Sequence, residues 1–535
     1  MEPYYPHLSS IGPAPSANEI YATYRRAFAQ QVSDGIRRPV VFPDHFWTII
    51  LLVIYLCIPH KEHPRIYALR WPLVGFITWF EFCKIWDRSS VGVGLGLQAS
   101  LISAFYIVLA WTWLVFLRPQ WDAKRVQRVK LQKNFDVDDQ SEPIKPLIKK
   151  GSLRQRKFID GQTENFGEDE IDKETYRYFW QSYPENLKDR IPWVLDLIFN
   201  MRGPGWNWAI SSIPSLPPEI LKKAGERVPE VAYLNVLPVG IQRFNTRREL
   251  LLYHLSRYIF SLILLDAIKV IMMKDPYFKF GPTSYELPSY LESLSPFMLQ
   301  FYRLAVTAVA IIISVIANYS LPALIISCLG GSHIFGLRAE PWYYPSIWGS
   351  FSRVLEKGLD GFWADFWHQS FRFYFTAPYV YLLRKGYISP GSSAAKIVSL
   401  VIAFGISGLL HGAASISAFS ATYPSHMMSF FLLQGLGIAV QRAYCSILST
   451  YIKRLPNSIR YAGNLLFTFT WLFYTGWLNA DDLARGGLWI SEPVPFSFLH
   501  FLGFGESDTE FRRWKNLGFE WHAGKHWWQS GYIVI

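Results

Sequence analysis

The sequence predicts an all-α, multi-pass integral membrane protein with about seven to nine transmembrane helices. Of the 535 residues, 50% are hydrophobic and 17% are aromatic, and 22 of them are tryptophan. Several apolar runs are long enough for a helix to cross a bilayer, which takes ~20 residues. Lipid offers no hydrogen-bond partner to open backbone groups, so spanning segments of this composition should be helices.

Apolar runs that qualify as candidate spans are spread along most of the chain, and the shorter ones could be tilted or re-entrant. No basic cap with a short apolar core precedes them, so we expect the first run to act as the insertion signal. The runs are Phe46–Cys57, Trp71–Ile85, Val91–Leu117, Leu250–Met273, Phe301–Cys328, Ile397–Gly412, Met427–Val440 and Ala462–Trp477.

Composition divides the chain into five regions. A polar N-terminal segment, residues 1–45, precedes the N-terminal transmembrane helices of residues 46–117. A polar basic loop, residues 118–248, comes next. The transmembrane core with the candidate catalytic residues is expected at 249–480, and the C-terminal tail at 481–535.

The net charge of +12 comes from 53 basic and 41 acidic residues. Nucleic-acid binding is one interpretation of such a surplus. A membrane protein whose basic loops face anionic lipid is the better one, and it places the loop of residues 118–248 in the cytosol. We therefore expect the lipid bilayer as a partner, no nucleic acid, and a location in the endoplasmic reticulum or a related endomembrane.

Common motifs of other chemistries are missing from the sequence. Four cysteines lie in or beside apolar segments without a Cys-x-x-Cys pair, so we expect neither a disulfide framework nor a metal site. There is no His-x-x-x-Asp or His-x-x-x-x-Asp motif, no Gly-x-Ser-x-Gly elbow, no Walker loop and no His-Glu-x-x-His. Charged pairs three residues apart, Glu81 with Lys84 and Asp266 with Lys269, are expected to pair with each other.

Two histidines are the best candidates for chemistry. His411 lies in an apolar run, and His368 lies upstream in a run rich in aromatic residues. A titratable group at membrane depth is costly, so it usually faces a cavity or a partner. A neutral imidazole can accept a proton from a hydroxyl, as a general base must near neutral pH.

The surroundings of each histidine leave two interpretations open. A helix over Phe362–Phe375 would gather the polar residues within an arc of about 100°, where Asp365 and Arg372 could orient His368. The same pattern is typical of an interfacial anchor helix in which the histidine only packs. Around His411, small residues indicate either close helix packing with the histidine bonded across the interface or a tunnel to the ring. These small residues are Ser407, Gly408, Gly412, Ala414 and Ser415.

Four passages stand out as motifs: Arg202-Gly-Pro-Gly-Trp-Asn-Trp208, Asp275-Pro-Tyr-Phe278, Trp348-Gly-Ser with Phe362-Trp-Ala-Asp-Phe-Trp-His368, and Phe404-Gly-Ile-Ser-Gly-Leu-Leu-His411. With them, residues 190–500 resemble the membrane-bound O-acyltransferases, and among these the fungal wax synthase-like branch that includes secondary-metabolite acetyltransferases. The resemblance implies a helical core that encloses a tunnel. His411 matches the catalytic histidine, and His368 matches a second active-site position at which many members have asparagine.

The resemblance implies direct transfer of an acyl group, without a permanently bound cofactor. His411 would take the hydroxyl proton of the acceptor as its oxygen attacks an acyl-CoA thioester. His368 would stabilise the oxyanion or orient the donor, and Trp367, Gln369 and Arg372 would bind the donor. The implied co-substrate is acetyl-CoA, and the implied acceptor is an apolar hydroxylated natural product such as a terpenoid or meroterpenoid of a fungal secondary-metabolite pathway.

Three alternatives accompany this hypothesis. Within the same class, the protein could be a long-chain acyl-CoA wax or sterol ester synthase. A proton-coupled transporter could use His411 and Asp266 as a proton path, although it predicts repeats that the sequence lacks. A structural or lipid-scaffold protein would tolerate replacement of both histidines.

Overall fold

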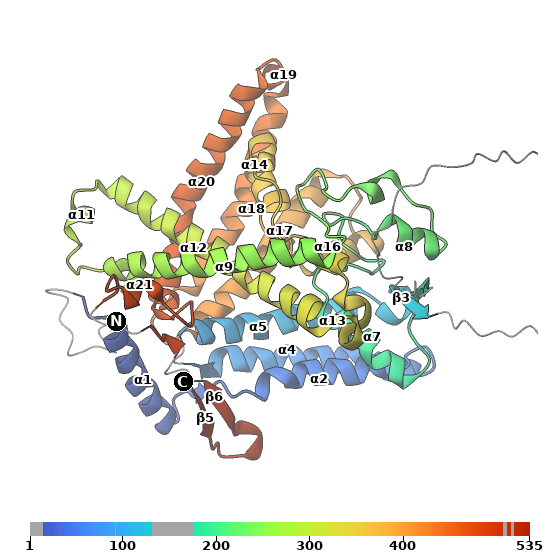
Figure 1. The fold of residues 1–535 in the computed structure, drawn as a ribbon, viewed down its shortest axis with the longest axis horizontal. Coiled ribbons are helices and arrows are strands. Elements are labelled where there is room, and N and C mark those ends of the chain that lie inside the picture. The colour runs from blue at the N-terminus through green and yellow to red at the C-terminus, as the bar shows by residue number, and fades with distance from the viewer. Residues whose placement is uncertain (1–13, 91–92, 131–175, 507–510, 515–517, 535) are drawn as a thin grey trace, which may run out of the picture.

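The computed structural model describes residues 14–90, 93–130, 176–506, 511–514 and 518–534, and it is mostly helical (Figure 1). Each of the predicted apolar runs falls on a long helix, apart from residues 91–92, which lie outside the described residues. The helices are α2 (Asp44–Cys57), α4 (Arg70–Asp87), α5 (Val93–Trp111), α9 (Arg247–Lys274), α12 (Pro296–Leu324), α17 (Ser393–Ser417), α18 (Pro424–Ile447) and α20 (Asn457–Arg485).

Four helical stretches are both long and apolar enough to cross a membrane: Gly96–Phe116, Pro296–Gly330, Ser393–Ser417 and Pro424–Ile447. Helix α2 is apolar but shorter, at 14 residues. A membrane-bound helical fold is therefore supported, while the number of crossings stays a prediction.

Helices α2, α4 and α5 form one layer, and α9 crosses the molecule beside α12 (Figure 1). Helix α17 packs between α5, α16 (Arg372–Arg384) and α18. Helices α18 and α20 run together away from this body and are joined by α19 (Ser449–Ile452) at their far end (Figure 1). The buried residues of α17 gather in its C-terminal half, from Ser407 to Ser417.

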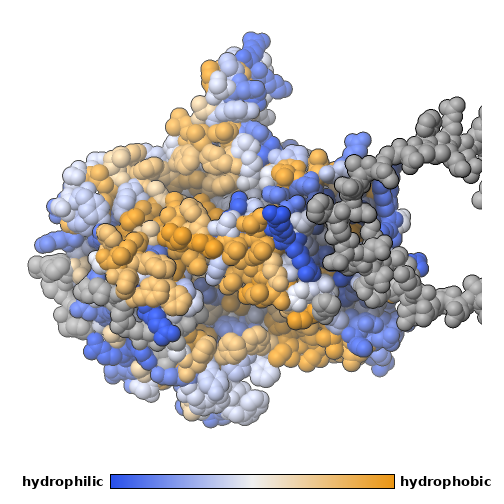
Figure 2. Space-filling view, viewed as in Figure 1, coloured by the Kyte–Doolittle hydropathy of each residue, from blue (hydrophilic) through white to orange (hydrophobic). Residues whose placement is uncertain are grey.

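The outer surface carries many large apolar side chains, which colour much of the view over α9 and α12 orange (Figure 2). On α9, Leu252, Phe260 and Ile263 are exposed, and on α4, Trp79 and Trp86 are exposed. A surface of this kind is unusual for a soluble monomer and is suited to lipid.

The polar regions are more structured than their composition indicates. Helix α1 (Ala17–Ser33) occupies the N-terminal segment, and its N-cap Ser16 forms a capping box with Glu19. In the polar basic loop, β3 (Arg125–Lys130) pairs antiparallel with β4 (Tyr176–Gln181). Residues 131–175, between these strands, lie outside the described residues.

Further short elements connect these parts. Strand β1 (Arg38–Pro39) pairs parallel with β2 (Arg88–Ser89), and β5 (Phe519–His522) pairs antiparallel with β6 (Gly531–Val534) in the tail. Three π-helical turns occur at η1 (Thr112–Phe116), η3 (Ile325–Gly330) and η6 (Phe362–Phe366). The short α-helices are α3 (Pro64–Ala68), α6 (Pro119–Asp122), α7 (Leu187–Phe199), α8 (Pro218–Lys223), α10 (Tyr277–Phe280), α11 (Ser289–Glu292), α13 (Gly331–Phe335), α14 (Ser352–Lys357), α15 (Leu359–Gly361) and α21 (Phe498–Phe501). The 3-10 turns are η2 (Glu230–Tyr233), η4 (Gly336–Ala339), η5 (Pro341–Tyr343), η7 (Leu488–Ile490) and η9 (Trp527–Gln529).

One of the two predicted intrahelical ion pairs is wrong. Lys84 and Glu81 do pair, at 2.8 Å. On α9, however, Lys269 Nζ donates to the carbonyl oxygens of Trp489 (2.7 Å) and Ile490 (2.8 Å). Asp266 accepts from the Ser497 hydroxyl and from the Leu499 backbone N–H. Both charged side chains therefore bind the C-terminal tail. The tail offers each of them more than one hydrogen-bonding group, whereas the helix offers only the opposite charged side chain.

Candidate active site

The ring of His411 is oriented by its own helix. Its Nδ1 lies 2.8 Å from the carbonyl oxygen of Ser407, one turn earlier in α17. A carbonyl only accepts, so Nδ1 carries the proton and Nε2 of the neutral ring keeps a free lone pair. Phe431 of α18 packs on the ring with centroids 4.4 Å apart. The arrangement presents Nε2 as a proton acceptor.

The small residues beside His411 serve close packing. A Cβ on Gly408 would lie 2.7 Å from Met428 Sδ and 3.2 Å from Met428 Cα, so glycine lets α18 approach at this point. A Cβ on Gly412 would meet the Pro424 carbonyl oxygen at 3.3 Å. The predicted interpretation of helix packing fits these glycines, although the hydrogen bond of His411 goes to its own helix and not across the interface. A tunnel to the ring stays a prediction.

The predicted continuous helix over Phe362–Phe375 is wrong. The π-turn η6 ends at Phe366, and Trp367 has an extended backbone with φ −62° and ψ 146°. Helix α16 begins only at Arg372. His368 therefore lies on a turn between two helices and not on a polar helical stripe. Turns beside π-helical segments are frequent at functional sites.

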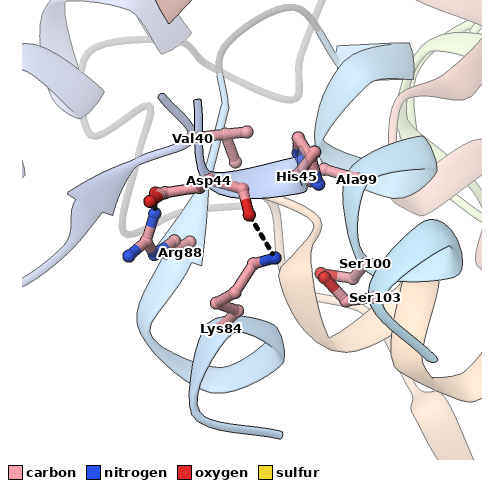
Figure 3. A pocket seen from close by; sticks show the side chains of 8 residues that line it. All are labelled: Val40, Asp44, His45, Lys84, Arg88, Ala99, Ser100 and Ser103. Atoms are coloured by element: carbon pink, nitrogen blue, oxygen red, sulfur yellow. Dashed lines mark hydrogen bonds and ion pairs between the residues drawn. The ribbon is translucent and has the colours of Figure 1, made fainter. Parts of the chain in front are cut away.

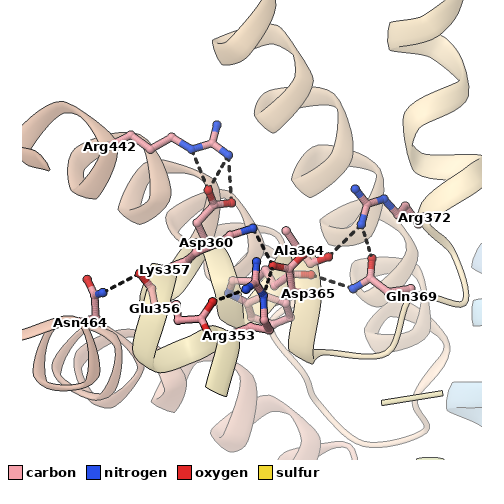
Figure 4. A network of polar contacts seen from close by, with 11 residues as sticks. Arg353, Glu356, Lys357, Asp360, Ala364, Asp365, Gln369, Arg372, Arg442 and Asn464 are labelled. Atoms are coloured by element: carbon pink, nitrogen blue, oxygen red, sulfur yellow. Dashed lines mark hydrogen bonds and ion pairs between the residues drawn. The ribbon is translucent and has the colours of Figure 1, made fainter. Parts of the chain in front are cut away.

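Asp365 does not orient His368. Its carboxylate accepts from Arg353 Nε at 3.1 Å and from Lys357 Nζ at 2.8 Å, both on α14 (Figure 4). The break after Phe366 separates the carboxylate from the histidine, which a continuous helix would have placed on the same face. Asp365 thus ties the π-turn to the preceding helix.

Gln369 and Arg372 hold the turn that carries His368. Gln369 Nε2 donates to the carbonyl oxygens of Trp367 (2.5 Å) and Trp363 (3.1 Å). Arg372 Nη1 donates to Gln369 Oε1 at 3.1 Å and to the Ala364 carbonyl at 2.8 Å (Figure 4). These bonds fix the backbone of the turn, and the binding of the donor by Trp367, Gln369 and Arg372 stays a prediction.

Aromatic rings enclose His368. Its ring centroid lies 5.5 Å from Trp367, 6.0 Å from Trp348 and 6.1 Å from Phe371. Its Nδ1 is buried and has no hydrogen-bond partner among the described residues. Burial, and after it the nearby His411 and Arg202, lowers the pKa of His368 to about 4. The side chain is therefore neutral at physiological pH, and the two histidines lie within electrostatic reach of each other.

The Trp348-Gly349 motif packs directly on the π-turn. The Gly349 N–H donates to the Phe366 carbonyl at 3.1 Å, and a Cβ on Gly349 would lie 2.1 Å from the Asp365 carbonyl oxygen. Only glycine permits this approach of two backbones. This approach brings the Trp348 ring against His368. Arg202 binds the carbonyl groups of Pro345 and Ser346, just before Trp348, so three of the four sequence motifs meet in one region.

The sequence analysis assigned no role to two buried residues of this region, Arg202, which opens one of the motifs, and His254. Arg202 Nη1 donates to the Ser346 carbonyl at 2.8 Å, and Nη2 donates to the Pro345 carbonyl at 2.5 Å. His254 on α9 is 1% exposed, with its Nδ1 3.2 Å from Ser320 Oγ on α12. The cost of a titratable group in an apolar helix, which singled out His411, would have identified His254 as well.

The remaining motif, at Asp275, belongs to a different part of the core. The Asp275 carboxylate accepts two hydrogen bonds from the Arg303 guanidinium, at 2.8 and 2.9 Å. The neighbouring Tyr277 hydroxyl donates to Asp481 at 2.7 Å. These contacts join α10 to α12 and α20, and Tyr277 packs in the same core cluster as α1.

Two cavities in the described part of the chain lie apart from the histidine pair. One is polar and lies between α2, α4 and α5, where Lys84 Nζ donates to the Asp44 carbonyl at 3.1 Å (Figure 3). The other is lined by residues of α10, of the loop after α17 and of the end of α20. Within the described residues, no group of three or more His, Cys, Asp or Glu side chains is placed to hold a metal ion.

The two histidine segments carry the similarity to known proteins. Residues 344–433 match the Membrane bound O-acyl transferase family, and this stretch contains both His368 and His411. This part of the chain is therefore similar to that family. The membrane-bound O-acyltransferase match ends within α18, next to Phe431, and thus covers the elements that build the histidine site.

Similar curated proteins are fungal. The chain is 24% identical to O-Mevalon transferase yanI of Aspergillus niger, over 57% of this chain and 65% of that protein. It is 26% identical to O-Mevalon transferase macI of Penicillium terrestre, over 54% and 61% of the two chains. It is 22% identical to Acetyltransferase ple2 of Rhodocybe pseudopiperita, over 56% and 69%. The matches thus span about two thirds of these relatives, and no solved structure matches.

Proposed function

We propose that this protein is a membrane-bound O-acyltransferase that moves an acyl group from acyl-CoA onto a hydroxyl of an apolar natural product. The observation that carries the proposal is the hydrogen bond from His411 Nδ1 to the Ser407 carbonyl, which leaves Nε2 free as a base. The family match and the fungal relatives named as transferases support it. The site is proposed to lie in an endoplasmic reticulum or related membrane.

The proposed reaction begins when the acceptor hydroxyl gives its proton to His411 Nε2 while its oxygen attacks the thioester carbonyl carbon. The carbonyl oxygen becomes an oxyanion. When the tetrahedral intermediate collapses, the carbon–sulfur bond breaks and the CoA thiolate takes the proton from the imidazolium. The products are the ester and free CoA, and no covalent acyl-enzyme forms.

His368 is proposed to stabilise the oxyanion. A neutral imidazole carries one N–H, which can donate a hydrogen bond, and its pKa of about 4 keeps it neutral near pH 7. A donor that is already fixed by surrounding rings loses little freedom when charge develops. The exposed part of Trp367 could contact the donor, whereas Gln369 and Arg372 would act by holding the turn.

The proposed donor is acetyl-CoA and the proposed acceptor is a terpenoid or meroterpenoid alcohol. Two relatives are named acetyltransferases, which supports a short acyl group. Two others are named for transfer of mevalon, so a mevalonyl thioester belongs among the donors tested. A long-chain wax or sterol ester synthase would instead prefer palmitoyl-CoA.

The test uses membranes that contain the full-length protein and measures ester formation and CoA release. Farnesol serves as the probe alcohol, with acetyl-CoA, mevalonyl-CoA and palmitoyl-CoA as donors. His411→Ala should abolish transfer while the protein still accumulates in membranes. His60→Ala is the control at another histidine: His60 is 3% exposed, its Nε2 lies 3.1 Å from the Tyr55 carbonyl oxygen, and its ring packs against Trp121 of α6. Product formation by His411→Ala at the wild-type rate would overturn the proposal.

A further inference from the structure

Arg202 is a buried cation without a carboxylate partner among the described residues. The side chain is 4% exposed, and it donates to the carbonyl oxygens of Pro345 and Ser346 and to the Tyr319 hydroxyl. All three acceptors are uncharged. Burial of a charge without a counter-charge is costly, and the Tyr319 ring, 4.9 Å from the guanidinium carbon, offsets part of that cost.

The segment that Arg202 binds leads directly to His368. Ser346 is held on its other side as well, because its N–H donates to the Gln242 carbonyl at 2.8 Å and its hydroxyl accepts from the Gln242 N–H at 2.9 Å. Two residues later, the Trp348 ring meets the His368 ring edge-on, at 86°. The backbone from Pro345 to Trp348 is thus fixed from both sides immediately before it contacts the histidine.

We propose that Arg202 is a positioning residue of the acyl-transfer site: it fixes the Pro345–Trp348 segment against His368 and supplies a permanent positive charge close to that ring. The inference rests on the proposed function, since it assigns Arg202 a role in the same reaction. Misplacement of a catalytic group by about 1 Å can lower the rate ~100-fold, so a residue that holds His368 in position can justify the cost of burying its charge.

The charge acts in the direction that the reaction needs. After burial, the nearby His411 and Arg202 are what lowers the pKa of His368. The rings that surround His368, those of Trp348, Trp367 and Phe371, are uncharged. A fixed cation near the ring disfavours the imidazolium and stabilises negative charge on a substrate oxygen at the same place. Arg202 would therefore add to the burial that keeps His368 neutral, and it would strengthen the local field for the oxyanion.

Two substitutions separate position from charge. Arg202→Lys keeps the charge and loses the two-pronged contact with Pro345 and Ser346, whereas Arg202→Gln keeps a donor and loses the charge. Arg243→Gln is the matched control, because Arg243 is 3% exposed and also donates to backbone carbonyls, at Ser215 (2.8 Å) and Ala232 (3.1 Å). Tyr319→Phe is a milder variant that removes one acceptor of Arg202 and keeps its charge, so it tests position alone.

The experiment measures the pKa of His368 from hydrogen exchange at its imidazole C2 by mass spectrometry, in nanodiscs, together with kcat and KM for acetyl-CoA with farnesol. Arg202→Gln should raise the pKa of His368, while burial still holds it below the ordinary value of about 6.5. It should lower kcat by about 10- to 100-fold with little change in KM. Arg202→Lys should retain the low pKa and recover part of kcat.

The control should lower Tm without changing either the His368 pKa or kcat. An unchanged His368 pKa and kcat in Arg202→Gln, with a loss of Tm like that of Arg243→Gln, would overturn the proposal and leave Arg202 a structural residue. The pKa readout needs no turnover. If the wild type transfers no acyl group, the proposed function fails while the effect of Arg202 on His368 is still measured.

Discussion

His411 takes its orientation from its own helix, whereas His368 depends on segments distant in sequence. The partner of His411 is the Ser407 carbonyl, four residues earlier. His368 is placed by a break after Phe366 and by Trp348, which arrives from another segment and is itself held by Arg202 through its neighbours. A base that needs one lone pair can be fixed locally, while a hydrogen-bond donor aimed at a developing charge requires support from several directions.

The largest expected effect comes from exchanging the base. His411→Asn should lower kcat by about 100- to 10,000-fold, because an amide has no basic lone pair that could take the hydroxyl proton. Acyl transfer by membranes with matched amounts of protein gives the measurement. Retention of more than a tenth of the activity would mean that His411 only packs against Phe431.

At His368, asparagine should be tolerated far better than alanine. His368→Ala should lower kcat by about 100- to 1,000-fold, as removal of an oxyanion donor does. His368→Asn should recover most of that loss, because an amide N–H can donate in place of the imidazole. Equal losses for Asn and Ala at this position would assign His368 to proton transfer instead.

A glycine pair tests the close approach that positions His368. A Cβ on Gly349 would lie 2.1 Å from the Asp365 carbonyl oxygen, whereas a Cβ on Gly405 of α17 meets nothing within 4 Å. Gly349→Ala should lower stability by about 1–3 kcal/mol and reduce kcat, since the π-turn must shift. Gly405→Ala should leave both unchanged. Thermal unfolding in detergent and the transfer assay give the two readouts.

The smallest expected effect concerns Asp365. Asp365→Asn removes its ion pairs with Arg353 and Lys357 but no contact of His368. We expect lower thermal stability with kcat within about threefold of the wild type, because ion pairs with a partly exposed lysine contribute little. A loss comparable to that of His368→Ala would restore the idea that this carboxylate orients the histidine.

The sequence predicted what depends on local composition. Apolar runs located the long helices because lipid or protein surrounds them along their whole length, and His411 was identified by its cost in such a run. The break at Trp367 was missed because it is fixed by Gln369, Arg372 and Gly349, whose contacts no periodicity displays. The pairing of Lys269 was wrong for the same reason, since its acceptors lie more than 200 residues away.

The clasp between α9 and the C-terminal tail bears on how this protein is made. The carbonyl groups that bind Lys269 belong to residues synthesised 220 and 221 positions later. While the ribosome completes the chain, α9 is made with its Lys269 ammonium and the Asp266 carboxylate still lacking their final partners. Folding of the core therefore finishes only after the tail has been synthesised. A premature stop before Trp489 would leave the charges of Lys269 and Asp266 without these partners.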